Sequence, residues 1–155
     1  MSLASWPEWS KWLAPQMSEP NLRKLPAFDQ ARKFLKSQAN TQGQLPRSLE
    51  GDATAWLILG DGYFTEAGKA TQSPLLGHAE RAFRKAAELS PQSALAHYWL
   101  GRVLVRLSLP DPAKGEKQRP NIDYLRDADK ELKQAYSLDN SLPRMSLHDQ
   151  AMHAY

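Results

Sequence analysis

The chain contains 155 residues, of which 41% are hydrophobic and 24% charged, with 11 prolines, 8 glycines, no cysteine and a net charge of +3. This length is that of one ordinary domain with a sizeable core, and the composition excludes collagen-like, low-complexity and wholly disordered chains. The lack of cysteine excludes disulfides, thiolate metal clusters and cysteine nucleophiles, and the scattered charge gives no basic stripe of the kind that binds nucleic acids.

The first expected element is a short helix that carries three tryptophans. Trp6, Trp9 and Trp12 follow one another at steps of three and are expected on one arc, and Ser5 with Glu8 forms a candidate capping box at its start. Because tryptophan buries a large apolar area, we expect this helix to pack on the rest of the chain as a lid. Peptide capture and insertion at a membrane interface are the alternatives.

A second helix is expected over residues 26–39, where Phe28, Ala31 and Leu35 recur at helical spacing. The segment TQGQLPRSLEG then links it to the next element. This helix is either the second helix of a degenerate preceding repeat or a cap on the helices that follow.

Residues 53–140 hold two units that align with each other, and each unit predicts two helices. In the first unit, about 53–92, Asp52 caps a helix to about residue 65, and Ser73 before Pro74 starts a helix that ends near residue 90. Its signature positions hold Trp56, Leu59, Gly60 and Tyr63, then Ala79, Phe83, Ala86 and Pro91.

The second unit, about 94–141, repeats this plan. Ser93 caps a helix to about residue 109, Pro110 ends it, and Asn121 caps a helix to about residue 138. The corresponding positions hold His97, Leu100, Gly101 and Leu104, then Ala128, Leu132, Ala135 and Asn140.

The pattern resembles the tetratricopeptide repeat, in which a Trp, a Leu-Gly pair and a Tyr on one helix precede an Ala, a Phe, an Ala and a Pro on the next. The first unit matches every signature position, and the second departs at His97, Leu104 and Asn140. The resemblance implies an all-α fold in which antiparallel helix hairpins stack into a right-handed superhelix. Gly60 and Gly101 are expected to let the two helices of each hairpin approach closely.

Two insertions lengthen the units, by about seven residues in the first and about fifteen in the second. Both fall between the first and second helix of a unit, so we expect both to emerge at the same edge of the stack. They are either variable surface loops or part of a specific binding or oligomer contact.

The last expected helix covers residues 143–155 and begins at Pro143. Its apolar residues fall on two stripes, so we expect it either to pack on a second chain or to precede further residues, rather than to cap the stack. Because about three repeats are needed for a continuous core, residues 1–50 are expected to form a helical cap on the repeat domain of residues 51–155, in one compact unit.

The sequence contains no motif for catalysis or for a cofactor. Its histidines, His78, His97, His148 and His153, lack metal-ligand spacing, and neither glycine-rich phosphate loop is present. No serine, histidine and aspartate are arranged as a nucleophile with its base. We therefore expect no metal, no cofactor and no enzymatic activity. His97 is expected to be a packed helix residue.

The resemblance implies binding of a peptide or partner protein along the concave surface formed by the first helix of each unit. Carried over position by position, this groove consists of Thr54, Leu57, Asp61, Phe64, Leu95, Tyr98, Arg102 and Val105, with Arg144 and Leu147 from the last helix. Its mixed apolar character suits an extended or helical segment, with Arg102 available for a carboxylate. Leu57 and Asp61 stand where relatives that capture acidic chaperone tails have a lysine and an asparagine, which disfavours that partner.

The main expectation is a small cytoplasmic adaptor or scaffold for a protein or peptide partner. One alternative is a structural or oligomerisation module of a larger assembly or homo-oligomer, with the groove filled internally by the tryptophan helix. The other is nucleic-acid binding, which predicts affinity that falls steeply with salt. No apolar run approaches the about 18 residues of a membrane span, and the start of the chain lacks a secretory-signal pattern, so no membrane contact is expected.

Overall fold

The computed structural model describes residues 1–16, 25–68, 73–110 and 120–142, and within these ranges the regular structure is helical. The elements are α1 (Trp6–Leu13), the short 3-10 helix η1 (Ala14–Gln16), α2 (Pro26–Gln38), α3 (Ala53–Ala67), α4 (Pro74–Leu89), α5 (Ala94–Ser108) and α6 (Ile122–Leu138). The all-α class expected from the sequence is confirmed. The helix expected over residues 143–155 lies outside the described residues.

The four helices of the two units begin where the sequence places their caps. A side-chain oxygen in each cap accepts a hydrogen bond from a backbone N–H of the first turn, and the capping residues are Asp52, Ser73, Ser93 and Asn121. Such a bond satisfies an N–H group that has no partner inside the helix, and it contributes about 1 kcal/mol. The capping box expected at Ser5 is wrong, because Ser5 itself has helical backbone angles and its hydroxyl bonds Ser2 instead.

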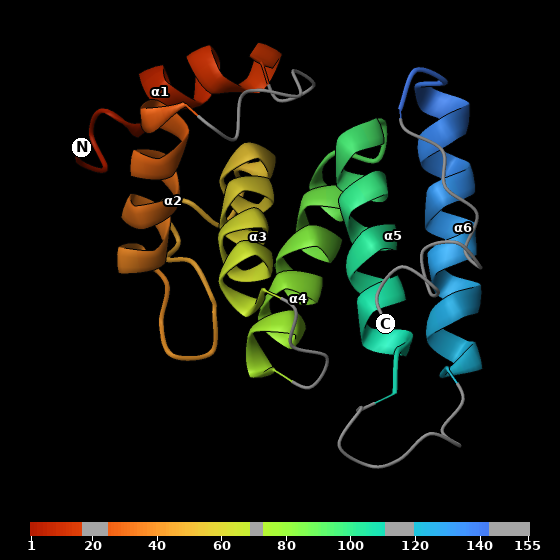
Figure 1. Ribbon diagram of the computed structural model, residues 1–155. Coiled ribbons are helices and arrows are strands. Elements are labelled where there is room, and N and C mark those ends of the chain that lie inside the picture. Colours follow the sequence, from red (N-terminus) through yellow and green to blue (C-terminus); the bar gives the residue numbers. More distant parts are fainter. Residues whose placement is uncertain (17–24, 69–72, 111–119, 143–155) are drawn as a thin grey trace.

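Helices α3 to α6 pack in chain order, and successive helices alternate in direction (Figure 1). In the first hairpin Gly60 faces Phe83, and the ring of Tyr63 lies 5.2 Å from that of His78. Rising residue numbers in α3 therefore meet falling numbers in α4, which makes the pair antiparallel. The first helices of the two units, α3 and α5, run in the same direction, as the stacking of two hairpins requires.

The carboxyl ends of α3 and α5, where the two insertions begin, lie together. The Arg106 guanidinium near the end of α5 donates a hydrogen bond to the carbonyl oxygen of Gly68, directly after α3. The Asn121 N–H, before α6, donates to the Ser108 carbonyl at 2.7 Å. These flanking contacts confirm that both insertions begin at the same edge, while residues 69–72 and 111–119 lie outside the described residues.

Helix α2 runs in the same direction as α3. Arg32 contacts Asp61 and, one turn further along both helices, Lys36 contacts Glu66. The segment of residues 39–52 carries the chain back to the start of α3 (Figure 1). In a stack of antiparallel hairpins, the second helix of a preceding repeat would run opposite to α3. Because α2 runs parallel to α3, it is not such a helix, and a cap stays the interpretation of α2.

Helix α1 lies across one end of α2 and α3 (Figure 1). The Trp6 ring is buried, stacks on Phe34 at a centroid distance of 5.9 Å and donates its indole N–H to Asp52 Oδ2 at 2.6 Å. Leu13 is also fully buried, whereas Trp12 is 48% exposed. The expected lid is therefore present, but the tryptophans do not share one buried arc.

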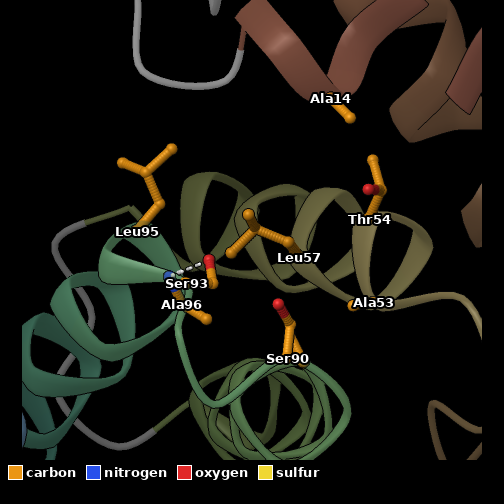
Figure 2. A pocket seen from close by; sticks show the side chains of 9 residues that line it. Ala14, Ala53, Thr54, Leu57, Ser90, Ser93, Leu95 and Ala96 are labelled. Carbon is orange, nitrogen blue, oxygen red and sulfur yellow. Dashed lines mark hydrogen bonds between the residues drawn. The ribbon is translucent and has the colours of Figure 1, made fainter. Parts of the chain in front are cut away.

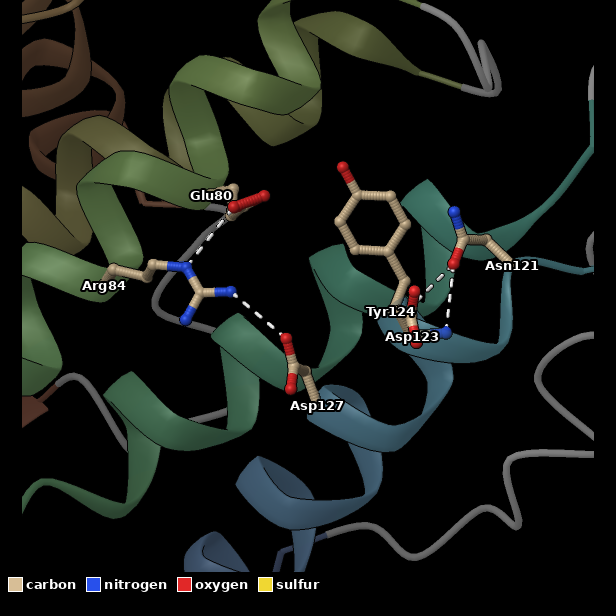
Figure 3. A network of polar contacts seen from close by, with 6 residues as sticks. All are labelled: Glu80, Arg84, Asn121, Asp123, Tyr124 and Asp127. Carbon is tan, nitrogen blue, oxygen red and sulfur yellow. Dashed lines mark hydrogen bonds and ion pairs between the residues drawn. The ribbon is translucent and has the colours of Figure 1, made fainter.

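The second helices of the two units, α4 and α6, are connected by an ion-pair chain (Figure 3). Arg84 Nε lies 3.3 Å from Glu80 Oε2, and Arg84 Nη2 lies 3.8 Å from Asp127 Oδ2. These groups are partly exposed to solvent, so the pairs contribute at most about 1 kcal/mol each and fix orientation more than stability. In the described ranges, no helix is both long and apolar enough to cross a bilayer.

Candidate functional site

Eight of the ten expected groove residues lie on α3 and α5, and Arg144 and Leu147 fall outside the described residues. The structure divides the eight among three settings. A cavity at the amino-terminal ends of the two helices is lined by Thr54, Leu57 and Leu95. A surface of arginines and aromatic rings further along includes Phe64 and Arg102. The packing buries Asp61 and Val105, and it also buries Tyr98, whose ring borders the same surface.

The cavity has a volume of about 210 Å³ and lies where η1 approaches the ends of α3, α4 and α5 (Figure 2). Its lining residues are Ala14, Ala53, Thr54, Leu57, Ala86, Ser90, Ser93, Leu95 and Ala96. In Figure 2 the side chain of Thr54 points toward Ala14, and that of Leu57 points along α3 toward the side on which Leu95 lies. The volume is smaller than the roughly 300 Å³ of typical small-molecule sites, so it suits an aliphatic side chain of a peptide.

Few polar side chains line the cavity, and one of them is already used in a hydrogen bond that caps α5. The Ser93 hydroxyl accepts the Ala96 N–H at 3.2 Å as the cap of α5. The cavity can therefore select for apolar shape, while orientation must come from groups outside it.

Asp61 is buried in the contact between α2 and α3, so it is not accessible to a ligand in the groove. Its side chain is 5% exposed, and Oδ2 lies 3.3 Å from Nη1 of Arg32, whose guanidinium also lies 5.0 Å from the ring of Phe28. The carboxylate thus joins the cap helix to the first unit. Sequence reasoning missed Arg32 because the pair joins residues 29 positions apart, in elements whose relative direction no local pattern specifies.

Tyr98 and Val105 are also buried, with 9% and 4% of their surface exposed. Tyr98 packs in a small cluster with Leu132 and Ala135 of α6. Its alanine variant would therefore disturb the second hairpin as well as any ligand.

A surface of arginines and aromatic rings lies beyond the cavity, where α3 and α5 face each other. It consists of Phe64, Tyr98, Trp99, Arg102 and Arg106, and we call it the arginine–aromatic surface. Phe64 meets Trp99 edge to face at 6.1 Å, which is a favourable aromatic geometry. The Arg102 guanidinium lies 4.9 Å from the centre of the Trp99 ring, and that of Arg106 lies 5.4 Å from the centre of the Phe64 ring.

No carboxylate in the described part of the chain forms an ion pair with Arg102 or Arg106. Burial, and then the nearby charge of Arg102, lower the pKa of Arg106 below its ordinary value. Both effects act against the charged form, as expected where two cations lie close together without an anion. Sequence reasoning named Arg102 and Phe64 but not Trp99 and Arg106, although the four-residue spacing of the arginines places both on one helical face.

Trp56 and His97, at equivalent signature positions, make equivalent hydrogen bonds. The Trp56 indole N–H donates to the carbonyl oxygen of Glu50 at 2.8 Å, and His97 Nε2 lies 2.8 Å from the carbonyl oxygen of Pro91. In both cases the partner lies six residues earlier in the chain. His97 also contacts Glu131 through Nδ1 at 2.7 Å, so the expectation of a packed helix residue is confirmed.

A second hollow, of about 280 Å³, lies between α1 and the start of α2 and is lined by Glu8, Trp9, Trp12 and Ala27. Trp9 and Trp12 meet edge to face there at 6.2 Å. Nothing among the surrounding described residues identifies an occupant for it.

Within the described ranges, no three histidine or acidic side chains come together in a way that could hold a metal ion. The most developed site is therefore the face of α3 and α5, with the cavity at one end and the arginine–aromatic surface at the other. No protein-family model, curated protein or solved structure matches the chain.

Proposed function

We propose that the chain is a non-catalytic scaffold of the tetratricopeptide type, which holds a peptide or a segment of a partner protein against α3 and α5. The observation that carries this proposal is the cavity at which Thr54, Leu57 and Leu95 meet from two helices of different units. All three are groove positions that the repeat resemblance assigns, and they line one apolar space.

Matching contacts in the two hairpins support the repeat assignment. A methyl group on Gly60 would meet the ring of Phe83, and one on Gly101 would meet Leu132, at equivalent signature positions. The equivalent hydrogen bonds of Trp56 and His97 add a second correspondence. We infer from these contacts that the hairpins are two copies of one plan, and we propose a right-handed superhelical stack as their arrangement.

The test is to fill the cavity in the folded protein. Thr54→Trp places a large ring among Ala14, Leu57 and Leu95, and Gln134→Trp on the exposed face of α6 is the matched control. Partners are first captured on the immobilised wild-type chain and identified, and their affinity for each variant is then measured. Loss of a buried anchor should weaken binding by about tenfold or more. Undiminished binding by Thr54→Trp, with circular dichroism unchanged, would reject the groove assignment.

The second candidate is a structural module whose groove is closed by its own amino-terminal segment. The observation in its favour is that Ala14 of η1 forms one wall of the cavity, next to the fully buried Leu13. Removing residues 1–20 separates the two candidates. A gain of peptide binding means that the segment occludes the groove, and loss of helical content means that it belongs to the core.

A further inference from the structure

We propose that the arginine–aromatic surface binds an acidic stretch of the partner segment, with carboxylate oxygens held by Arg102 and Arg106. This inference rests on the proposed function, because it names the chemistry of the segment that the face of α3 and α5 would hold. It extends the carboxylate contact expected of Arg102 to a second arginine, Arg106, which the repeat resemblance does not assign, and to the spacing of the ligand.

The two arginines are arranged to act on one ligand. They are four residues apart on α5, so they project from the same face about one turn apart. Arg102 lies over Tyr98 and Trp99, and Arg106 lies over Phe64 and donates to the Gly68 carbonyl. Rings and one carbonyl use few of the five N–H donors on each guanidinium, and carboxylates are the acceptors that match the remaining donors best.

Three cations that join helices of the described chain each pair with a carboxylate from a neighbouring helix, which the two arginines of this surface do not. Arg32 pairs with Asp61, Lys36 with Glu66, and Arg84 with Glu80 and Asp127. Among the residues that the structure describes, Arg102 and Arg106 contact aromatic rings and one backbone carbonyl but no carboxylate. The lowered pKa of Arg106 fits a site in which an anion would relieve the cost of holding two like charges together.

The distance to the cavity sets the pattern of the ligand. Arg102 and Arg106 follow Leu95 by seven and eleven residues on α5, which is about 10 and about 16 Å along the helix axis. An extended peptide covers such distances in about three to five residues. The expected ligand therefore has an aliphatic anchor for the cavity and acidic residues about three to five positions away from it.

A nucleic acid fits this face less well than an acidic peptide. Backbone binding depends on many phosphate contacts along a continuous basic track, and here the cations of the face are two neighbouring arginines. The other end of the same face is an apolar cavity, which suits an aliphatic side chain rather than a base. Single-stranded RNA therefore enters the experiment as a competing outcome.

The experiment measures fluorescence anisotropy with the full chain and two labelled ten-residue probes. One probe carries a leucine and, four positions later, two glutamates in a glycine–serine background, and the other has glutamines in place of the glutamates. The double variant Arg102→Gln with Arg106→Gln is compared with Arg126→Gln with Lys130→Gln. The control removes the same charge at the same spacing from exposed positions of α6.

The wild type should bind the glutamate probe about ten- to a hundredfold more tightly than the glutamine probe, because charge-assisted hydrogen bonds are lost in the latter. The Arg102–Arg106 variant should bind both probes equally, whereas the α6 control should keep the discrimination. Equal affinity of the wild type for both probes, binding of neither, or equal loss in both variants would overturn the inference. Tighter binding of a ten-residue oligouridylate would overturn it in favour of RNA.

These outcomes separate the inference from the function on which it rests. If Thr54→Trp weakens the captured partner while the Arg102–Arg106 variant leaves its affinity unchanged, the groove holds a ligand but not through its charge. If the charge discrimination is present and Thr54→Trp has no effect on the partner, the arginines bind anions and the proposed groove function fails.

Discussion

Gly60 lies so close to Phe83 that a methyl group on Gly60 would come within 2.7 Å of the ring. Gly101 has the same relationship to Leu132, at 2.6 Å. Phe83 is fully buried, so the ring has little space into which it can move. The close approach of the two helices in each hairpin therefore depends on a glycine, although glycine costs about 1 kcal/mol of helix propensity relative to alanine.

Gly60→Ala should lower the free energy of unfolding by about 1–3 kcal/mol, because overpacking against Phe83 exceeds the gain in helix propensity. Gly62→Ala, two residues further along α3, is the matched control. A methyl group there would meet flexible parts of Lys36 and Arg32 at 3.6 Å or more, which is ordinary contact. We expect it to be neutral or to stabilise by up to about 1 kcal/mol in urea unfolding. Equal stability of the two variants would contradict the packing argument.

Arg32→Met should destabilise the protein by about 3 kcal/mol, because it leaves the Asp61 carboxylate buried without its guanidinium partner. Adding Asp61→Leu to this variant should recover most of the loss, since an apolar pair of similar size removes the buried carboxylate as well as the guanidinium. Thermal unfolding of the two variants and the wild type measures this. If the double variant were no more stable than Arg32→Met, the ion pair would not be what makes the single change costly.

Trp6→Phe tests whether α1 is fixed to the start of α3. The substitution keeps most of the ring area on Phe34 but loses the hydrogen bond to Asp52, which should cost about 1.5–3 kcal/mol. Asp52→Ala should cost about 1 kcal/mol more, because Oδ1 of the same carboxylate caps α3 through the Ala55 N–H. Chemical unfolding curves give both values. If Trp6→Phe destabilised the protein more than Asp52→Ala, the Asp52 carboxylate would not be serving both as the acceptor of the indole N–H and as the cap of α3.

The stability of the protein should fall as the pH is lowered through the titration range of His78. Burial, followed by the charge of Arg81, lowers the pKa of His78 in the folded state. The unfolded chain, with a histidine pKa of about 6.5, therefore takes up this proton first, and the free energy of unfolding decreases from about pH 7 toward pH 5. His78→Gln should flatten this part of the profile, measured by urea unfolding at each pH. A variant profile as steep as that of the wild type would assign the loss to other groups.

The helices of the two units could be predicted from the sequence because their capping signals are local. Contacts between segments that are distant in sequence could not be predicted. The caps at Asp52, Ser73, Ser93 and Asn121 act within one turn, so the sequence alone locates each start. The ion pair of Arg32 and the indole bond of Trp6 join residues 29 and 46 positions apart. Neither partner can be identified before the direction of α2 and the position of α1 are known.

The tryptophan helix shows how spacing alone misled the interpretation. Steps of three residues turn a helix by about 300°, so Trp6 and Trp12 lie about 120° apart rather than on one narrow face. Trp6 is accordingly 2% exposed and Trp12 is 48% exposed. Spacing along the chain was equally insufficient for the groove. The repeat positions identified the residues that line the cavity, but they could not show that Asp61 forms an ion pair with Arg32 of α2.

The most direct test of the central claim is to titrate the isotopically labelled chain with a captured partner segment and to follow its amide and indole resonances by NMR. The account predicts the largest shift changes along α3 and α5, at Thr54, Leu95 and the Trp99 indole. Changes confined to α1, α2 or the outer face of α6, with α3 and α5 unaffected, would contradict it.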